Sequence, residues 1–79
     1  MIRVLFFGQV ADVMGQREVE SSPQSLSLLD LREHLFGKGT RGESLASKVL
    51  MSVNSEVVRD ERRLQPGDEV AFFSPFSGG

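Results

Sequence analysis

The sequence predicts a single α+β domain, in which a small mixed sheet of about five strands is covered by one main helix. Several short runs are rich in β-branched and aromatic residues and are separated by turn-forming residues. Only residues 26–36 combine the length and the apolar spacing of a substantial helix. The two most apolar runs, residues 2–7 and 69–73, lie near opposite ends of the chain. We therefore expect these two runs to pair in the centre of the sheet.

The composition limits the partners and the chemistry of the chain. Its 79 residues suit one domain, so we expect residues 1–79 to form a single domain with residues 74–79 as a C-terminal tail. A net charge of −2 and a pI of about 5.3 argue against nucleic acid or an anionic membrane as the main partner. The absence of cysteine excludes disulfides, thiolate metal ligands and a cysteine nucleophile. We expect a cytoplasmic protein, because no signal peptide or membrane-spanning stretch is evident.

The first strand is predicted at residues 2–7, where Arg3 is the only charged residue. Because side chains alternate along a strand, the apolar residues of the first and last strands divide into two sets. The inner set, expected to face the helix, is Ile2, Val4, Phe6, Val70 and Phe72. The outer set, which one layer of helix leaves uncovered, is Leu5, Phe7, Ala71 and Phe73. Such an uncovered patch indicates an interface, and the alternative is that Phe7 and Phe73 lie under a loop.

The segment after the first strand is predicted to contain a short helix and a weaker strand. Gly8 interrupts the strand, residues 9–14 have helical apolar spacing, and Gly15 is typical of a helix stop. Residues 17–20 are expected to form the second strand, in which Val19 is the only strongly apolar residue.

The main helix is predicted at residues 26–36. Ser25 is a suitable N-cap, and Gly37 follows the last apolar residue of the helix. One side of the helix is apolar and is expected to pack on the sheet, with leucines recurring at Leu28, Leu31 and Leu35. His34, the only histidine, lies among charged residues, so we interpret it as a solvated residue rather than a general base.

Two polar stretches of the second half are interpreted as surface segments. Residues 38–47 contain glycines that could cradle a phosphate, but no Walker pattern is present, so a surface loop is favoured. Residues 59–63 carry five charges of both signs. A solvated turn is favoured there over a basic contact for an anionic group.

The remaining elements complete the sheet. Strands are predicted at residues 48–53 and 56–58 around an Asn54-Ser55 turn, and residues 65–68 form a turn before the last strand. The order of elements is then strand, short helix, strand, helix and three strands. This arrangement is that of the β-grasp, or ubiquitin-like, roll.

The tail after the last strand contains the candidate reactive group. Gly78 and Gly79 have no Cβ, so this backbone is thin enough to thread a narrow channel and present the carboxylate of Gly79 to another protein. Pro75 limits disorder at the root of the tail, and Phe76 is suited to an apolar groove of a partner. We found no Ser-His-Asp set, carboxylate pair or metal-ligand spacing, so we expect no catalysis by this chain alone.

Two stretches carry a family resemblance. Val-Leu-Phe-Phe-Gly-Gln-Val at residues 4–10 resembles the opening of the MoaD-like sulfur-carrier subunits of molybdopterin synthase. Pro-Gly-Asp-Glu-Val-Ala-Phe-Phe at residues 66–73, followed by Gly78-Gly79, resembles the ending of that family, and Val53-Asn54 is a pair that the family commonly has. The similarity extends over the whole chain in length and element order.

The resemblance implies a β-grasp carrier whose terminal glycine, here Gly79, is adenylated and then converted to a thiocarboxylate. The expected partners are a MoeB-like activating enzyme, which uses ATP, and a MoaE-like large subunit of molybdopterin synthase. In the large subunit the sulfur goes to a pyranopterin precursor of the molybdenum cofactor, and the complex is a heterotetramer. The residues expected to contact partners are Phe7, Phe73, Pro75, Phe76, Ser77 and Gly78. No cofactor or metal is expected on this chain itself.

Three alternatives are also compatible with the sequence. The first is a sulfur carrier for thiazole or cysteine synthesis, against which residues 5–7 favour the molybdopterin branch. The second is a ubiquitin-like modifier that is conjugated to proteins through Gly79. The third is an interaction domain whose tail has no function.

Overall fold

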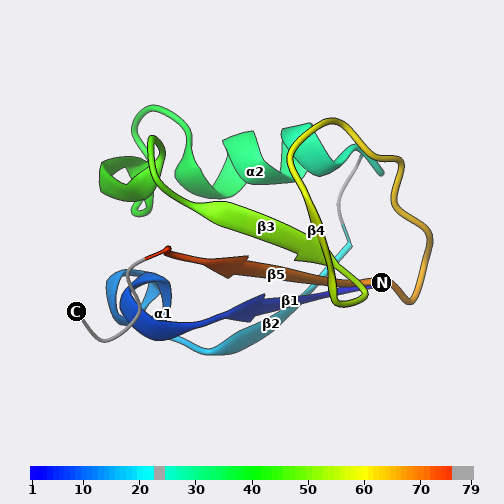
Figure 1. Cartoon of the computed structure of the whole chain (residues 1–79), viewed down its shortest axis with the longest axis horizontal. Coiled ribbons are helices and arrows are strands. Elements are labelled where there is room, and N and C mark those ends of the chain that lie inside the picture. The colour runs from blue at the N-terminus through cyan, green and yellow to red at the C-terminus, as the bar shows by residue number, and fades with distance from the viewer. Residues whose placement is uncertain (23–24, 76–79) are drawn as a thin grey trace.

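Five strands form one mixed sheet, and the computed structural model describes it within residues 1–22 and 25–75. In chain order the strands are β1 (Ile2–Phe6), β2 (Glu18–Ser21), β3 (Leu50–Val53), β4 (Glu56–Val58) and β5 (Glu69–Phe73). Across the sheet their order is β2-β1-β5-β3-β4 (Figure 1). β1 and β5 pair in parallel, and the other neighbours are antiparallel. The predicted pairing of the first and last strands is confirmed, and β5 is the central strand.

Two α-helices and one short 3₁₀ helix complete the fold: α1 (Gly8–Met14), α2 (Leu28–Phe36) and η1 (Glu43–Leu45). Figure 1 shows α2 lying along one face of the sheet and α1 at the end where β1 and β5 finish. The structure therefore has the predicted α+β architecture, with one main helix and one short helix.

The core lies between α2 and the inner face of the sheet. All five residues of the predicted inner set are buried, together with residues of both helices and of the η1 segment. Phe72 is at the centre of this core, with its ring centroid 5.0 Å from that of Phe36 and 6.2 Å from that of Phe6. Alternation along β1 and β5 thus assigns the inner face correctly.

The N-terminus of α2 differs from the prediction. The helix begins at Leu28 rather than at residue 26, and its N-cap is Ser27, whose Oγ accepts a hydrogen bond from Asp30 N at 3.1 Å. Ser25, the predicted cap, instead accepts a hydrogen bond from Ser27 N through its Oγ at 3.2 Å. Both serines can accept such bonds, so their types alone did not identify the cap.

The charged stretch at residues 59–63 is not simply a solvated turn, which corrects the favoured interpretation. The carboxylate of Glu61 accepts hydrogen bonds from Ser27 Oγ and, at 3.1 Å, from Leu29 N. Leu28 N also donates to Arg62 O at 3.0 Å. The first amides of α2, which have no partner within the helix, are thereby satisfied by a segment that is distant in the sequence. The hydrogen bonds that the Glu61 carboxylate accepts lower its pKa below the ordinary value. The bond from Ser27 has the largest effect, followed by that from Leu29 N.

The stretch at residues 38–47 also contributes to the core. It contains η1, and Leu45 is buried, so this segment is only partly a surface loop. Arg41 Nε donates a hydrogen bond to Val13 O at 2.8 Å, which connects the segment to the last turn of α1. Neither contact resembles a phosphate cradle.

The two predicted helix-ending glycines have different roles. Gly15 adopts the left-handed conformation, with φ of 75°, as expected for a helix stop. Gly37 has an extended backbone with φ of −73°, and a Cβ at this position would collide with the carbonyl oxygen of Glu33. Glycine is therefore needed at position 37 for space rather than for a positive φ.

Candidate functional site

The outer face of the sheet is the candidate site, because α2 covers only the opposite face. Strand register arranges its side chains in rows that run across the sheet. The first row is Glu20, Arg3 and Glu69, the second is Glu18, Leu5, Ala71, Ser52 and Val57, and the third contains Phe73 and Leu50. The outer face is therefore charged at the start of β1 and β5 and apolar where these strands end.

The apolar end of the outer face is partly open to solvent. Phe7 lies between the end of β1 and the first residue of α1. It has an extended backbone and is 51% exposed. Val57 on β4 is 58% exposed, whereas Leu5, Leu50 and Phe73 are partly buried. Ala71 and its register partner Ser52, both in the second row, are buried. Exposed apolar groups of this kind on one face favour protein binding.

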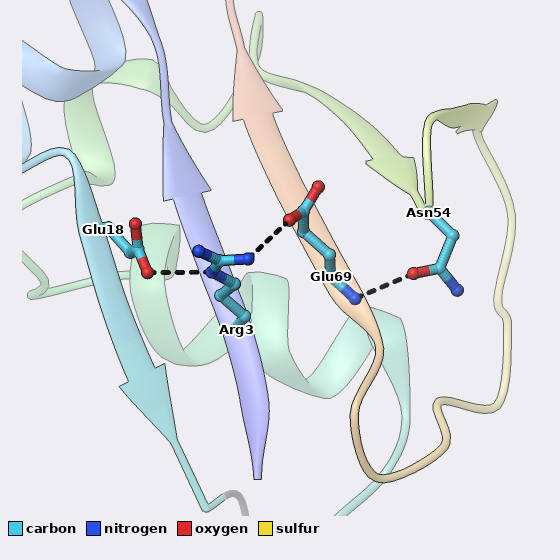
Figure 2. A network of polar contacts seen from close by, with 4 residues as sticks. All are labelled: Arg3, Glu18, Asn54 and Glu69. Atoms are coloured by element: carbon cyan, nitrogen blue, oxygen red, sulfur yellow. Dashed lines mark hydrogen bonds and ion pairs between the residues drawn. The ribbon is translucent and has the colours of Figure 1, made fainter.

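The charged end of the outer face is organised by Arg3. Its Nε donates to Glu18 at 2.8 Å and one terminal nitrogen donates to Glu69 at 3.3 Å, so the guanidinium connects three adjacent strands (Figure 2). The hydrogen bond to Glu18, and then the charges of Glu18 and Glu69, raise the pKa of Arg3 above its ordinary value. All three side chains are substantially exposed, so we assign this network to the polarity of the face rather than to the stability of the fold.

Asn54 fixes the start of β5 next to this network. Its Oδ1 accepts a hydrogen bond from Glu69 N and its Nδ2 donates to Asp68 Oδ1, both at 3.0 Å (Figure 2 shows the former). Asn54 has φ of 49° and Ser55 has φ of 73°, so the two form the tight turn between β3 and β4 that was predicted. The amide of Asn54, and then the backbone N–H of Gln65, lower the pKa of Asp68 by hydrogen bonding.

The structure places some, but not all, of the predicted site residues. Phe7 and Phe73 lie at the apolar end of the outer face. Pro75 follows β5 and is exposed, whereas Ser74, between Phe73 and Pro75, is buried. The other predicted site residues, Phe76, Ser77, Gly78 and Gly79, lie outside the described residues. The roles of all of them in binding or reaction stay predictions.

Leu50 and Val57 also belong to the outer face, and sequence analysis did not assign them to it. The signal was available in the two-residue turn at Asn54-Ser55, which fixes the register of β3 and β4. Met51 is in the core, so side-chain alternation along β3 places Leu50 on the outer face. Val57 pairs with Ser52, the residue after Met51, and therefore lies on the outer face as well.

Within residues 1–22 and 25–75, no group of three or more histidine, cysteine, aspartate or glutamate side chains could hold a metal ion. His34 is exposed on α2. None of the helices described there has the length and apolar character required to cross a membrane.

Comparisons with known proteins agree with this fold. The model of the ThiS family matches residues 4–79. The molybdopterin synthase sulfur carrier subunit of Escherichia coli K12 is 39% identical over 82 residues, which cover all of both chains. The protein of the same name from Haemophilus influenzae is 34% identical, again over all of both chains.

Solved structures give the same architecture. A complex of subunits 1 and 2 of the molybdopterin-converting factor from Helicobacter pylori contains a chain that matches with a TM-score of 0.71. The match covers 99% of this chain and 97% of that one at 20% identity, and supports the fold alone. SAMP1 from Haloferax volcanii matches with a TM-score of 0.66 at 28% identity over 99% and 98% of the two chains. The predicted β-grasp fold is confirmed.

Proposed function

The chain belongs to the ThiS family, and from this membership we propose that it is the sulfur-carrier subunit of a molybdopterin synthase. The observation that carries the proposal is the 39% identity over the full length of the sulfur carrier subunit of Escherichia coli. The chain then takes part in molybdenum cofactor biosynthesis, as a sulfur donor that is not catalytic alone. We further propose that it acts in the cytoplasm.

The reacting group in this proposal is the carboxylate of Gly79. A carboxylate is a poor acyl electrophile, so an activating enzyme first joins it to the AMP moiety of ATP and releases pyrophosphate. A hydrosulfide equivalent then displaces AMP and leaves a thiocarboxylate. When this sulfur passes to the pyranopterin precursor, an oxygen from water takes its place and the carboxylate is restored.

The outer face is the proposed docking surface for the large subunit. Its apolar end is next to the residue where β5 finishes, so a partner that covers Phe7 and Phe73 is held beside the root of the tail. From Pro75 to Gly79 the chain spans at most about 14 Å, at roughly 3.3–3.6 Å per residue. Docking on this face therefore leaves the carboxylate within reach of a neighbouring active site. We propose a heterotetramer, in which each of two large subunits binds one carrier.

A mass measurement tests the proposal. The chain is incubated with a MoeB-like activating enzyme, ATP and a sulfur source, and its intact mass and terminal peptide are determined. Exchange of one oxygen for sulfur in the terminal peptide is expected. A variant extended by one alanine after Gly79 keeps the domain but displaces the reactive carboxylate, so it should show no exchange. An unchanged mass under conditions that convert the Escherichia coli carrier would contradict the proposal.

A second candidate function is favoured by the likeness to SAMP1, which is also named small archaeal modifier protein 1. In that case Gly79 would form an isopeptide bond with lysines of target proteins. Mass spectrometry of tagged protein from cells separates the two functions, because a modifier leaves its tryptic fragment, residues 64–79, joined through Gly79 to lysines of target proteins. A carrier for thiazole or cysteine synthesis would instead fail to restore molybdopterin production with the large subunit.

A further inference from the structure

A groove lies between α2 and the β3–β4 hairpin, on the side of the sheet that α2 covers. It encloses about 210 Å³. Its lining consists of five apolar residues and two arginines: Leu29, Val49, Leu50, Met51, Val58, Arg32 and Arg59. Met51 and Val58 face each other across the two strands and form the floor together with Val49. The groove shares only Leu50 with the outer face.

The size of the groove limits its occupant. Sites for small molecules and cofactors usually enclose about 300–1,000 Å³. The groove is smaller, and it is open to solvent at Leu29, which is 42% exposed. A volume of this size suits one aliphatic side chain of a partner, inserted as an anchor into an apolar pocket.

The two arginines specify the charge of that occupant. Among residues 1–22 and 25–75, the ion pairs are those of Arg3 with Glu18 and Glu69 and of Arg62 with Glu56. Arg32 and Arg59 therefore line the groove without a carboxylate partner in this part of the chain. Arg32 donates a hydrogen bond to Ala46 O, which holds its guanidinium in place, and its other N–H groups remain able to bind an anion.

We propose that this groove binds a peptide segment of a partner protein in which a branched aliphatic side chain is adjacent to an acidic residue. The aliphatic group fills the cavity against Met51 and Val58, and the carboxylate pairs with Arg32 and Arg59. Because the lining differs from the outer face except at Leu50, a protein can occupy the groove while the large subunit occupies the outer face. The proposal does not depend on the sulfur chemistry of the tail.

A peptide titration tests this site. The acetylated peptide Glu-Leu-Val-Leu-Asp is added to the full chain, and methyl resonances of Leu29 and Val58 are followed by NMR. These resonances should shift and saturate. The peptides Lys-Leu-Val-Leu-Lys and Glu-Ser-Ser-Ser-Asp, which remove the charge match or the aliphatic anchor, should bind at least about tenfold more weakly.

A matched pair of charge reversals locates the acidic contact. Arg59→Glu should weaken peptide binding by about tenfold or more, because an attraction becomes a repulsion. Arg17→Glu makes the same change in net charge before β2, at the opposite edge of the sheet, and should alter binding by less than about twofold. Both arginines are exposed, so circular dichroism should show folded protein in each case.

Several results would overturn the proposal. One is the absence of shifts at Leu29 and Val58, and another is equal binding of the acidic and basic peptides. If deleting residues 76–79 moves the same methyl resonances without peptide, the occupant is the chain's own tail. If these resonances move with protein concentration alone, the occupant is a second copy of the chain.

Discussion

The inner and outer faces of the sheet both carry phenylalanine, and the residues concerned are sequence neighbours at the ends of β1 and β5. Phe72 faces α2 and is fully buried against Phe6 and Phe36, whereas Phe73 faces the other way and is only partly buried. Phe6 and Phe7 differ in the same manner, since Phe6 is buried and Phe7 is 51% exposed. Apolar character alone therefore does not assign a residue to folding or to binding. The face that the helix covers decides it.

The largest expected effect is on the inner face. Phe72→Ala removes a fully buried ring at the centre of the core and should lower the free energy of unfolding by about 3–5 kcal/mol. Urea unfolding followed by circular dichroism measures this change. A loss below about 1 kcal/mol would mean that the inner face is not the main source of stability.

A smaller effect on stability, but a clear one on binding, is expected on the outer face. Phe7→Ala should lower the free energy of unfolding by only about 1 kcal/mol, because no more than half of this side chain is buried. The same change should weaken binding to the molybdopterin synthase large subunit by about tenfold or more. Titration calorimetry with the purified large subunit measures this loss.

A matched control for the outer face is Leu29→Ala. Leu29 is another exposed apolar residue, 42% accessible, but it lies on α2 beside the groove. Binding of the large subunit should be unchanged in this variant. Equal weakening by both substitutions would show that the large subunit does not distinguish the two regions.

The smallest of the three main effects, below the roughly 1.4 kcal/mol of a tenfold loss of binding, concerns the end of the helix that covers the inner face. Ser27→Ala removes the side chain that caps α2 and bonds Glu61, and should lower the free energy of unfolding by about 1 kcal/mol. Ser25→Ala serves as the control, with an expected loss of less than about 0.5 kcal/mol because Ser25 does not cap the helix. Thermal unfolding of both variants ranks the two serines, and the reverse ranking would contradict this assignment of the cap.

The sequence was sufficient for the architecture because local patterns and long-range packing agree. Alternation in residues 2–7 and 69–73 predicted the inner face, and the apolar character of these two runs predicted the pairing of β1 with β5. Turn chemistry at Asn54-Ser55 and at residues 65–68 predicted the connections on both sides of the charged stretch. Each of these features depends on neighbouring residues, which a sequence displays directly.

The features that were missed depend on contacts between distant segments. Glu61 satisfies the N-terminus of α2 from a position 34 residues after Ser27, and no local pattern distinguishes it from a solvated glutamate. Leu45 is buried because η1 returns to the core, although the surrounding stretch is polar. The groove between α2 and the hairpin has the same origin, since residues of the helix and of the two strands line it together only in the folded chain.

The central place of β5 has a consequence for how the protein is made. Arg3 and Glu69 are register partners although 66 positions separate them, so β1 leaves the ribosome long before its neighbour exists. A translation product that stops before residue 69 would leave β1 and β3 with facing unpaired edges, and such species aggregate or are degraded. Only molecules translated past residue 73 can therefore close the sheet.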